Sequence, residues 1–126
     1  MIEGLFTDSN YLAAKRMLDV TVLRQDAIAS NLANIETPNY KRLDVSTSFE
    51  AQLKQAVSNR DPEQIAAVQP QLAVDSSARS SRSDGNTVQL ETELLHMNQN
   101  MVEHALETQL VTNQLAKMRM AITGKS

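Results

Sequence analysis

The chain of 126 residues contains no cysteine and no tryptophan, and only three glycines, three prolines, two tyrosines and two phenylalanines. The absence of cysteine excludes disulfides, thiolate metal sites and cysteine nucleophiles. The scarcity of glycine and aromatic residues argues against an all-β sandwich, because that fold needs many turns and large side chains on its sheets. A net charge of −3 provides no basic field for a polyanion, so we expect no nucleic-acid partner.

The length suits a single domain spanning residues 1–126, and an apolar share of 41% is enough to form a core. No apolar run reaches the roughly 18 residues that a membrane-spanning helix needs. Residues 1–8 lack the basic segment and long apolar stretch of a secretory signal peptide. We therefore expect that any export of the chain proceeds without a cleaved leader.

Residues 8–35 predict one long helix, since neither glycine nor proline interrupts them before Pro38. Asp8 or Ser9 is the candidate N-cap. The apolar seam of this helix includes Leu18, Ile28 and Leu32. A helix of about 40 Å cannot bury such a stripe alone, so it must pack on another element.

Residues 86–123 predict a second long helix, with Asn86 or Thr87 as its cap and Gly124 as its stop. Positions in strict four-three spacing form a seam like that of a coiled coil: Leu90, Leu94, Met97, Met101, His104, Thr108, Val111, Leu115, Met118 and Ile122. A second apolar row lies beside it: Leu95, Val102, Leu106 and Leu110. The apolar face is therefore wider than one partner helix requires.

The middle of the chain is weaker. Residues 36–57 hold a turn and a short amphipathic helix marked by Phe49, Leu53, Ala56 and Val57. Residues 58–85 contain Pro62, Pro70 and a serine-rich charged run, which predicts an irregular and partly mobile segment. The expected fold class is all-α.

The sequence offers little catalytic chemistry. Glu93 and His96 have the Glu-x-x-His spacing of ferritin-like di-iron proteins, but no second motif exists, so a solvated pair on the helix flank is the simpler interpretation. His104 in the seam is best explained as a packed, hydrogen-bonded residue or as a polar insert that sets the register of the helix pair. We find no nucleotide or catalytic motif and expect no catalytic residue, no metal, no cofactor and no small-molecule substrate.

The most unusual local feature is the exit from the first helix. Asn34 suits a left-handed C-cap, and Thr37 is held extended by the proline that follows it. Pro38 and Asn39 suit a tight turn. Tyr40 then offers an apolar ring, and we expect Lys41 and Arg42 to lie in water.

Residues 29–42, with the sequence ASNLANIETPNYKR, resemble the N-terminal signature of bacterial flagellar rod and hook proteins, which reads approximately NNLANxxTPGYKR. Asn39 replaces the usual glycine and still tolerates a positive φ. The short length, the helix after the signature and the string DGNTVQLETEL at residues 84–94 are similar to the short subunits of the proximal rod. The resemblance covers roughly residues 9–57 and 84–122.

The resemblance implies a non-enzymatic structural subunit of the flagellar basal body. Such subunits pass through the flagellar type III export apparatus and polymerise in the periplasmic space into a tubular rod that transmits torque. Their terminal helices pair as an antiparallel coiled coil. The implied partners are other rod subunits, copies of the same chain, and the export gate and membrane-ring region of the basal body.

On this interpretation we expect the seam to pack on the first helix, the second row to face neighbouring subunits, and the signature to hold the chain's exit from the coiled coil. The expected intrachain contacts join Leu90, Leu94, Met97, Met101, Val111, Leu115 and Met118 to Leu18, Ile28 and Leu32. The expected exit residues are Asn31, Asn34, Thr37, Pro38 and Tyr40. Two alternatives stay open: another short rod subunit, and a helical-hairpin adaptor or export chaperone.

Overall fold

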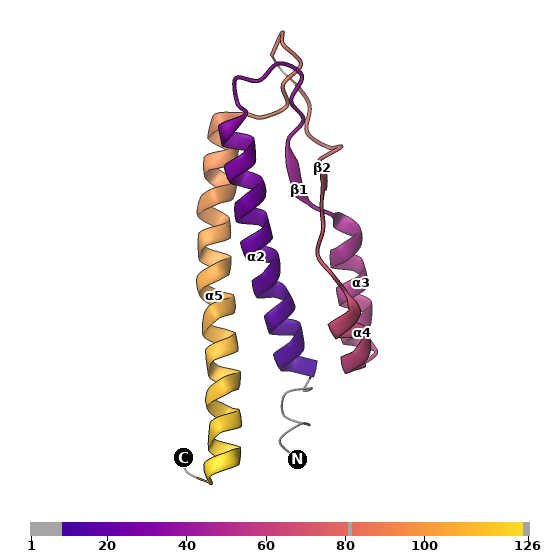
Figure 1. Cartoon of the computed structure of the whole chain (residues 1–126), viewed down its shortest axis with the longest axis vertical. Coiled ribbons are helices and arrows are strands. Elements are labelled where there is room, and N and C mark those ends of the chain that lie inside the picture. The colour runs from indigo at the N-terminus through magenta and orange to yellow at the C-terminus, as the bar shows by residue number, and fades with distance from the viewer. Residues whose placement is uncertain (1–8, 81, 125–126) are drawn as a thin grey trace.

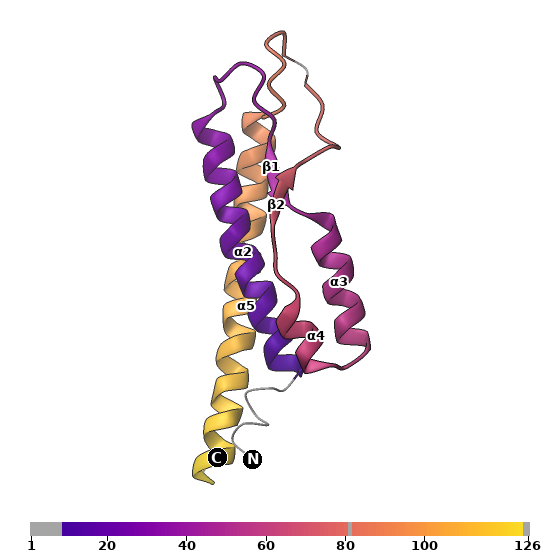
Figure 2. The ribbon, with the colours of Figure 1, turned by 45° about the vertical axis from the view of Figure 1, so that its right-hand side comes forward.

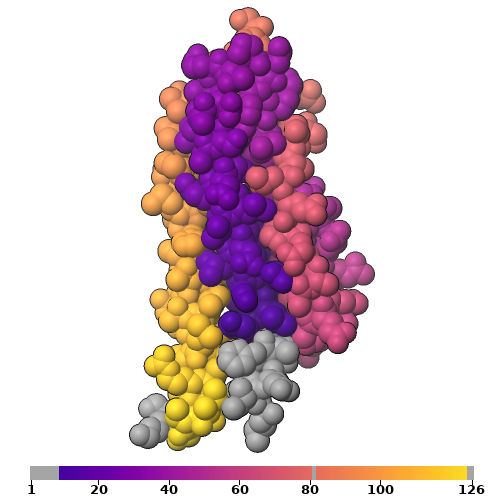
Figure 3. Space-filling view, viewed as in Figure 1, coloured from indigo at the N-terminus to yellow at the C-terminus, as the bar shows by residue number. Residues whose placement is uncertain are grey.

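The computed structural model describes residues 9–80 and 82–124. Two long helices, α2 (Ser9–Ala33) and α5 (Leu90–Thr123), lie side by side and run in opposite directions (Figure 1). The chain between them forms a smaller unit, here called the arm, from β1 (Leu43–Val45), α3 (Thr47–Ser58), α4 (Pro62–Ala67) and β2 (Leu72–Val74). Helix α2 therefore lies between α5 and the arm, as Figure 3 shows. Figure 2 shows the arm beside the pair of long helices.

The two predicted long helices are confirmed, with changes at their ends. Helix α2 ends at Ala33, and the expected cap Asp8 lies outside the described residues. Helix α5 begins at Leu90, with Gln89 at its N-cap and no capping side chain. It ends at Thr123, followed by Gly124 as the C-cap with a φ of 68°. The predicted start at residue 86 is wrong because Asn86 and Thr87 bond to the chain after α2 instead.

The arm is the part of the structure that differs most from the secondary structure predicted from the sequence. Strands β1 and β2 pair antiparallel, with Leu43 opposite Val74 and Val45 opposite Leu72, so the mainly helical fold also contains a small sheet. Residues 58–85 are not irregular throughout, since they hold α4 and β2. Asp61 caps α4 by accepting the N–H groups of Glu63 and Gln64, and this local bond forms despite the polar composition.

The hydrophobic core lies between α2 and the arm. It is built from Val20, Val45, Phe49, Leu53, Ala56 and Ile65, with Leu12, Met17, Leu23, Val68 and Leu72 packed against it. The predicted middle helix is confirmed as α3, which buries Phe49, Leu53 and Ala56 but leaves Val57 exposed. Burial of these side chains is the main source of stability for the arm, which is too small to fold alone.

The described helices include none with the length and apolar content that crossing a membrane requires.

Candidate functional site

The signature residues form a polar joint between α2, β1 and α5. Asn31 is fully buried, and its side chain pairs with the backbone of Leu43 in both directions: Nδ2 donates to the carbonyl at 2.9 Å and Oδ1 accepts the N–H at 2.8 Å. The hydroxyl of Tyr40 donates to Asn31 Oδ1 at 3.1 Å. The last turns of α2 are thereby attached to the first strand of the arm.

The turn after α2 has the predicted backbone conformation at Asn39 but not at Asn34. Asn39 adopts a φ of 62°, as its place in the signature predicts, and Tyr40 N–H donates to the Thr37 carbonyl to close the turn. Asn34 is not among the described residues with positive φ, so the predicted left-handed cap is wrong. Its side chain instead donates to the Ser30 carbonyl and accepts from the Thr37 hydroxyl, which satisfies the end of the helix locally.

Asn86 holds this turn from the far side of the chain, and the sequence analysis missed that role. Its Nδ2 lies within 2.8–3.1 Å of the carbonyl oxygens of Asn34, Ile35 and Thr37, while its Oδ1 accepts the N–H of Val88. The available signal was the resemblance of residues 84–94 to the start of the family's last helix. In the structure, Asn86 of this string lies in the loop before α5 and bonds to the turn after α2.

Arg42 lies at the centre of the joint. Its side chain is only 5% exposed; Nε donates to Glu93 at 2.6 Å, and Nη1 donates to Asp75 at 2.5 Å and to Asp44 at 3.3 Å. The expectations that Arg42 lies in water and that Glu93 is solvated are therefore both wrong. Neither local sequence shows the pairing, because the two residues are 51 positions apart.

The charges of the cluster stabilise one another. Burial alone would lower the pKa of Arg42, but its hydrogen bonds to Glu93 and Asp75 raise that pKa above the ordinary arginine value. Burial raises the pKa of Asp44, yet the N–H of Val45 and the guanidinium of Arg24 outweigh it and hold the pKa below its usual value. The Asp44 carboxylate thus stays charged beside Arg24 and Arg42.

The same cluster leaves Glu93 no part in a metal site. Its two carboxylate oxygens accept from Arg42 and from Asn31, at 2.6 Å and 3.3 Å. Across the residues that the structure describes, no group of three or more histidine, cysteine, aspartate and glutamate side chains could hold an ion.

The side of α5 that meets α2 is largely polar. Besides the fully buried Glu93, Asn100 donates to the carbonyl of Thr21 at 2.8 Å, and His104 Nδ1 lies 2.9 Å from the Thr21 hydroxyl. The predicted hydrogen bonding of His104 is confirmed, but the prediction that the residue is packed is wrong, because His104 is exposed. Met118, two heptads further along, is buried on the same side.

The seam prediction is wrong for several residues. Leu90, Leu94, Met101 and Leu115 are exposed and are not buried against α2, whereas Met97 and Val111 are half-buried. On α2, Ile28 is buried while Leu18 and Leu32 are half-buried. The reason is the rotation of α5, which points Glu93 and Asn100 at α2 and turns the leucine row to the side.

The second row, by contrast, is exposed along its whole length. Together with the displaced seam and Met120 it forms what we call the outer face of α5, a set of exposed apolar side chains that covers more than half of the helix circumference: Leu90, Leu94, Leu95, Met101, Val102, Leu106, Leu110, Leu115, Met120 and Ile122. Most of the exposed large apolar side chains in the described residues lie here. An apolar surface of this extent is typical of a site that binds another protein.

Comparisons with known proteins point to one family. A family model described as flagella basal body rod protein matches residues 21–41, which include most of the joint's signature. The chain is 30% identical to the flagellar basal body rod protein FlgB of Borrelia hermsii over 127 aligned residues, covering 86% of this chain and 92% of that protein.

Further relatives carry the same name. FlgB of Borreliella burgdorferi is 28% identical, with 85% of this chain and 90% of that protein covered. FlgB of Cereibacter sphaeroides is 28% identical, with 81% and 84% covered. The chain therefore belongs to the FlgB family of flagellar basal body rod proteins, which are structural components of the rod and not enzymes.

Proposed function

We propose that the chain is a subunit of the proximal rod and polymerises through its terminal helices into a tubular structure that transmits torque. The observation that carries this proposal is the outer face of α5, whose apolar residues are exposed in the single chain. Contact with neighbouring subunits would remove this surface from water, at roughly 25 cal/mol for each Å² buried.

The polar joint supports the mechanical part of the proposal. Torque passes through a subunit only if its elements keep their relative positions under load. Asn31 attaches α2 to β1, Asn86 attaches the turn to the chain before α5, and Arg42 attaches both strands to α5. We propose that α2 and α5 act as an antiparallel coiled coil in the rod, with the arm projecting from it.

We further propose that the subunit reaches the periplasmic space through the flagellar type III apparatus without a cleaved leader. There it would contact other rod subunits, copies of itself, and the export gate and membrane-ring region. The size of the core supports this route. The core lies only between α2 and the arm, and a small core is readily unfolded for passage through a narrow channel.

The hairpin-adaptor alternative fits the structure less well. An adaptor built from two self-sufficient helices would bury its apolar rows between them, whereas α2 and α5 meet through Asn100, His104 and Glu93. The match to FlgB proteins over most of the chain also favours this subunit over the other short rod subunits.

The test is Leu110→Asp, which places a charge on the outer face of α5 at an exposed position that the fold tolerates. We expect cells carrying it to lose swimming in soft agar and to lack assembled rods, while the chain is still exported. Gln52→Glu, which places a charge at an exposed polar position on α3 and away from the outer face of α5, is the control and should swim normally. Normal swimming of Leu110→Asp would refute the interface.

A further inference from the structure

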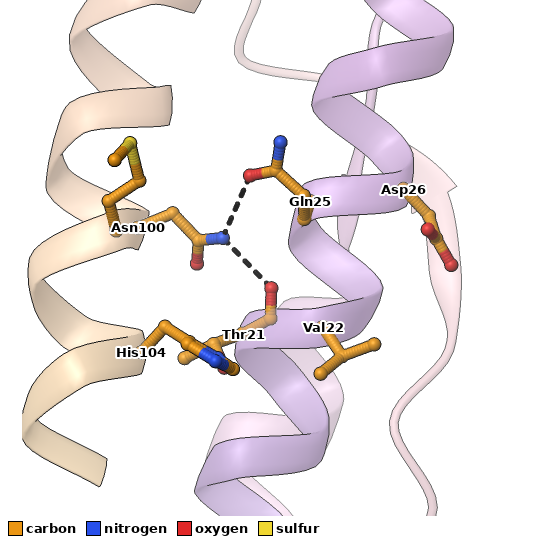
Figure 4. Close-up of a pocket in the computed structure, with 7 residues that line it drawn as sticks. Thr21, Val22, Gln25, Asp26, Asn100 and His104 are labelled. Atoms are coloured by element: carbon orange, nitrogen blue, oxygen red, sulfur yellow. Dashed lines mark hydrogen bonds between the residues drawn. The ribbon is translucent and has the colours of Figure 1, made fainter. Parts of the chain in front are cut away.

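Two grooves lie beside the contact of α2 with α5, and Thr21 lines both of them. The smaller, of about 370 Å³, contains Asn100, whose amide donates to the Thr21 carbonyl and lies 3.5 Å from the Gln25 oxygen (Figure 4). Asn100 is only 3% exposed, so a second molecule cannot reach its side chain. The larger groove, of about 620 Å³, lies on the other side of Thr21, toward Met17 and Arg24.

The larger groove is bounded by three helices. Leu53 and Val57 supply apolar surface on the α3 side, and Met17 of α2 lies at the base. The α5 side is acidic, because Glu103 and Glu107 line it. Val57 and Glu103 are exposed, and Met17 and Glu107 are half-buried, so a second molecule can contact both apolar and charged groups here.

Arg24 joins the two sides of this groove at the end nearest the joint. Its Nη2 lies 3.3 Å from Glu50 on α3, and its Nη1 lies 3.4 Å from Glu103 on α5. Its Nε donates to Asp44 at 3.1 Å. The guanidinium charge is therefore already shared among three carboxylates. Glu107, one turn beyond Glu103, forms no ion pair among the described residues.

Glu107 thus carries a charge that the single chain does not neutralise. Burial and the charge of Glu103 raise the pKa of Glu107. Lys54 also lines the groove, on α3, but no ion pair joins it to Glu107 in the described part of the chain. A cation from a second molecule would stabilise the Glu107 carboxylate, and apolar side chains beside that cation would cover Leu53 and Val57. The groove suits a segment that carries both.

The distribution of charge along α5 identifies such a segment. Residues 90–116 carry four glutamates and neither lysine nor arginine, whereas residues 117–123 carry Lys117 and Arg119 and no acidic residue. Neither cation forms an ion pair among the described residues, and both lie next to exposed apolar side chains of the outer face: Leu115, Met120 and Ile122. The end of α5 is therefore basic and apolar where the groove is acidic and apolar.

The other cations in the described ranges lack this combination. Four arginines form ion pairs within the chain: Arg16, Arg24, Arg42 and Arg82. Lys41 donates to the Gly85 carbonyl, and Lys54 belongs to the groove itself. The remaining three lie one turn from Asp19, directly before Asp61, or in the serine-rich run, and are respectively Lys15, Arg60 and Arg79.

We propose that the larger groove receives the end of α5, residues 115–123, from a second copy of the chain. The basic side chains of this segment pair with the Glu107 carboxylate, and its apolar side chains cover Leu53 and Val57. The inference rests on the proposed polymerisation and names one of its contacts.

The contact is directional. Lys117 and Arg119 lie 10 and 12 positions beyond Glu107 on the same helix, so two parallel copies are displaced by about 15–18 Å along its axis. Such a head-to-tail contact uses different surfaces on the two copies and repeats without closing, as a growing rod requires. Leu106 and Leu110 of the outer face flank Glu107 on α5, so the groove continues the proposed interface.

Site-directed crosslinking tests the contact, because the cysteine-free chain needs no background substitutions. Copies carrying Ser58→Cys, at the groove, are mixed with copies carrying Ala121→Cys, at the end of α5, and treated with a short bismaleimide. We expect a dimer in which mass spectrometry finds the two different copies linked. Adding Glu107→Lys to the first copy should reduce its yield about tenfold, because a charge-assisted contact becomes a repulsion.

Charge reversal on the other copy makes the test specific. Lys117→Glu and Arg119→Glu together should lower the yield by a similar factor, and combining them with Glu107→Lys on the first copy should restore it. Glu91→Lys on the first copy and Arg79→Glu on the second are the matched controls, both at exposed positions, and should leave the yield unchanged. Circular dichroism verifies that each variant folds.

A yield that Glu107→Lys leaves unchanged, that the combined reversal does not restore, or that depends on either control overturns the proposal. Sedimentation of the unmodified chain at increasing concentration separates this inference from the proposed function. Copies that assemble equally well with Glu107→Lys refute only the groove contact, whereas copies that stay monomeric at every concentration refute polymerisation as well.

Discussion

Arg42 shows how a single side chain can decide the arrangement of a helix. Placing its guanidinium beside Glu93 removes two charges from water, which costs about as much as their attraction returns. The pair is therefore weak as a source of stability but strong as a determinant of orientation. Only one rotation of α5 brings Glu93 to Arg42, and that rotation also directs Asn100 at Thr21. The leucines of α5 are left on the outside.

Glu93→Gln tests this at the residue scale. The substitution removes the buried carboxylate and leaves the Arg42 charge with Asp75 and Asp44 alone, so we expect the free energy of unfolding to fall by about 3 kcal/mol. Urea denaturation followed by circular dichroism measures the change. Glu36→Gln is the control, because that side chain is 90% exposed and 3.8 Å from Arg82; its effect should be under about 0.5 kcal/mol. Equal effects of the two variants would contradict the prediction.

At the scale of elements, the main role of the two strands is to position two carboxylates beside Arg42. Asp44 lies in β1 and Asp75 directly follows β2, so the pairing of the two strands brings both carboxylates to Arg42. A two-stranded ribbon is marginal by itself. Here it is held on one side by the core against α2 and at its end by the ion cluster that reaches α5.

This arrangement predicts an acid-sensitive attachment of the arm. Although burial alone raises the pKa of Asp75, hydrogen bonds from Ser77 and Arg42 lower it below its ordinary value, and the pKa of Asp44 is lowered as well. In the pH range below about 4 the unfolded chain therefore binds more protons at these sites than the folded chain does. The free energy of unfolding should fall as the pH decreases through this range, and urea midpoints measured against pH will show it.

Asp75→Asn should make that fall shallower, because one of the two groups no longer titrates. Glu107 acts in the opposite sense, since burial and the charge of Glu103 raise its pKa, and it offsets part of the effect. An Asp75→Asn variant with an unchanged pH profile would contradict the assignment.

At the scale of the whole molecule, the two sides of α2 have different roles. Its contact with the arm is apolar and forms the core, whereas its contact with α5 includes the buried polar residues Asn31, Glu93 and Asn100. The most apolar surface of α5 is thereby left exposed, and we propose that it makes the contacts between molecules. A protein of the rod family, which assembles with other rod proteins, needs such a division.

Association through the outer face of α5 should carry the thermodynamic signature of apolar burial. Dilution calorimetry of concentrated protein, repeated at several temperatures, should show a dissociation heat that rises with temperature, because apolar surface becomes hydrated. Leu110→Asp should show little heat of dissociation at the same concentrations. A dissociation heat that does not change with temperature would indicate that polar contacts carry the association instead.

The sequence by itself determined the local parts of this protein. Uninterrupted helical patterns predicted α2 and α5, apolar spacing predicted α3, and the signature predicted the positive φ of Asn39 and the family. Each of these depends on residues that are close together in the chain. Periodicity also showed that α5 has more than one apolar row, but not which row meets α2.

Tertiary structure decided how those parts meet. The partners Arg42 and Glu93 are 51 positions apart, and the pairing of β1 with β2 joins residues on either side of α3 and α4. A pattern of apolar residues shows which side chains share a face, but the face that turns inward depends on the total free energy of packing, hydrogen bonding and ion pairing. In this chain α5 turns Glu93 and Asn100 toward α2, and its outer apolar face stays exposed.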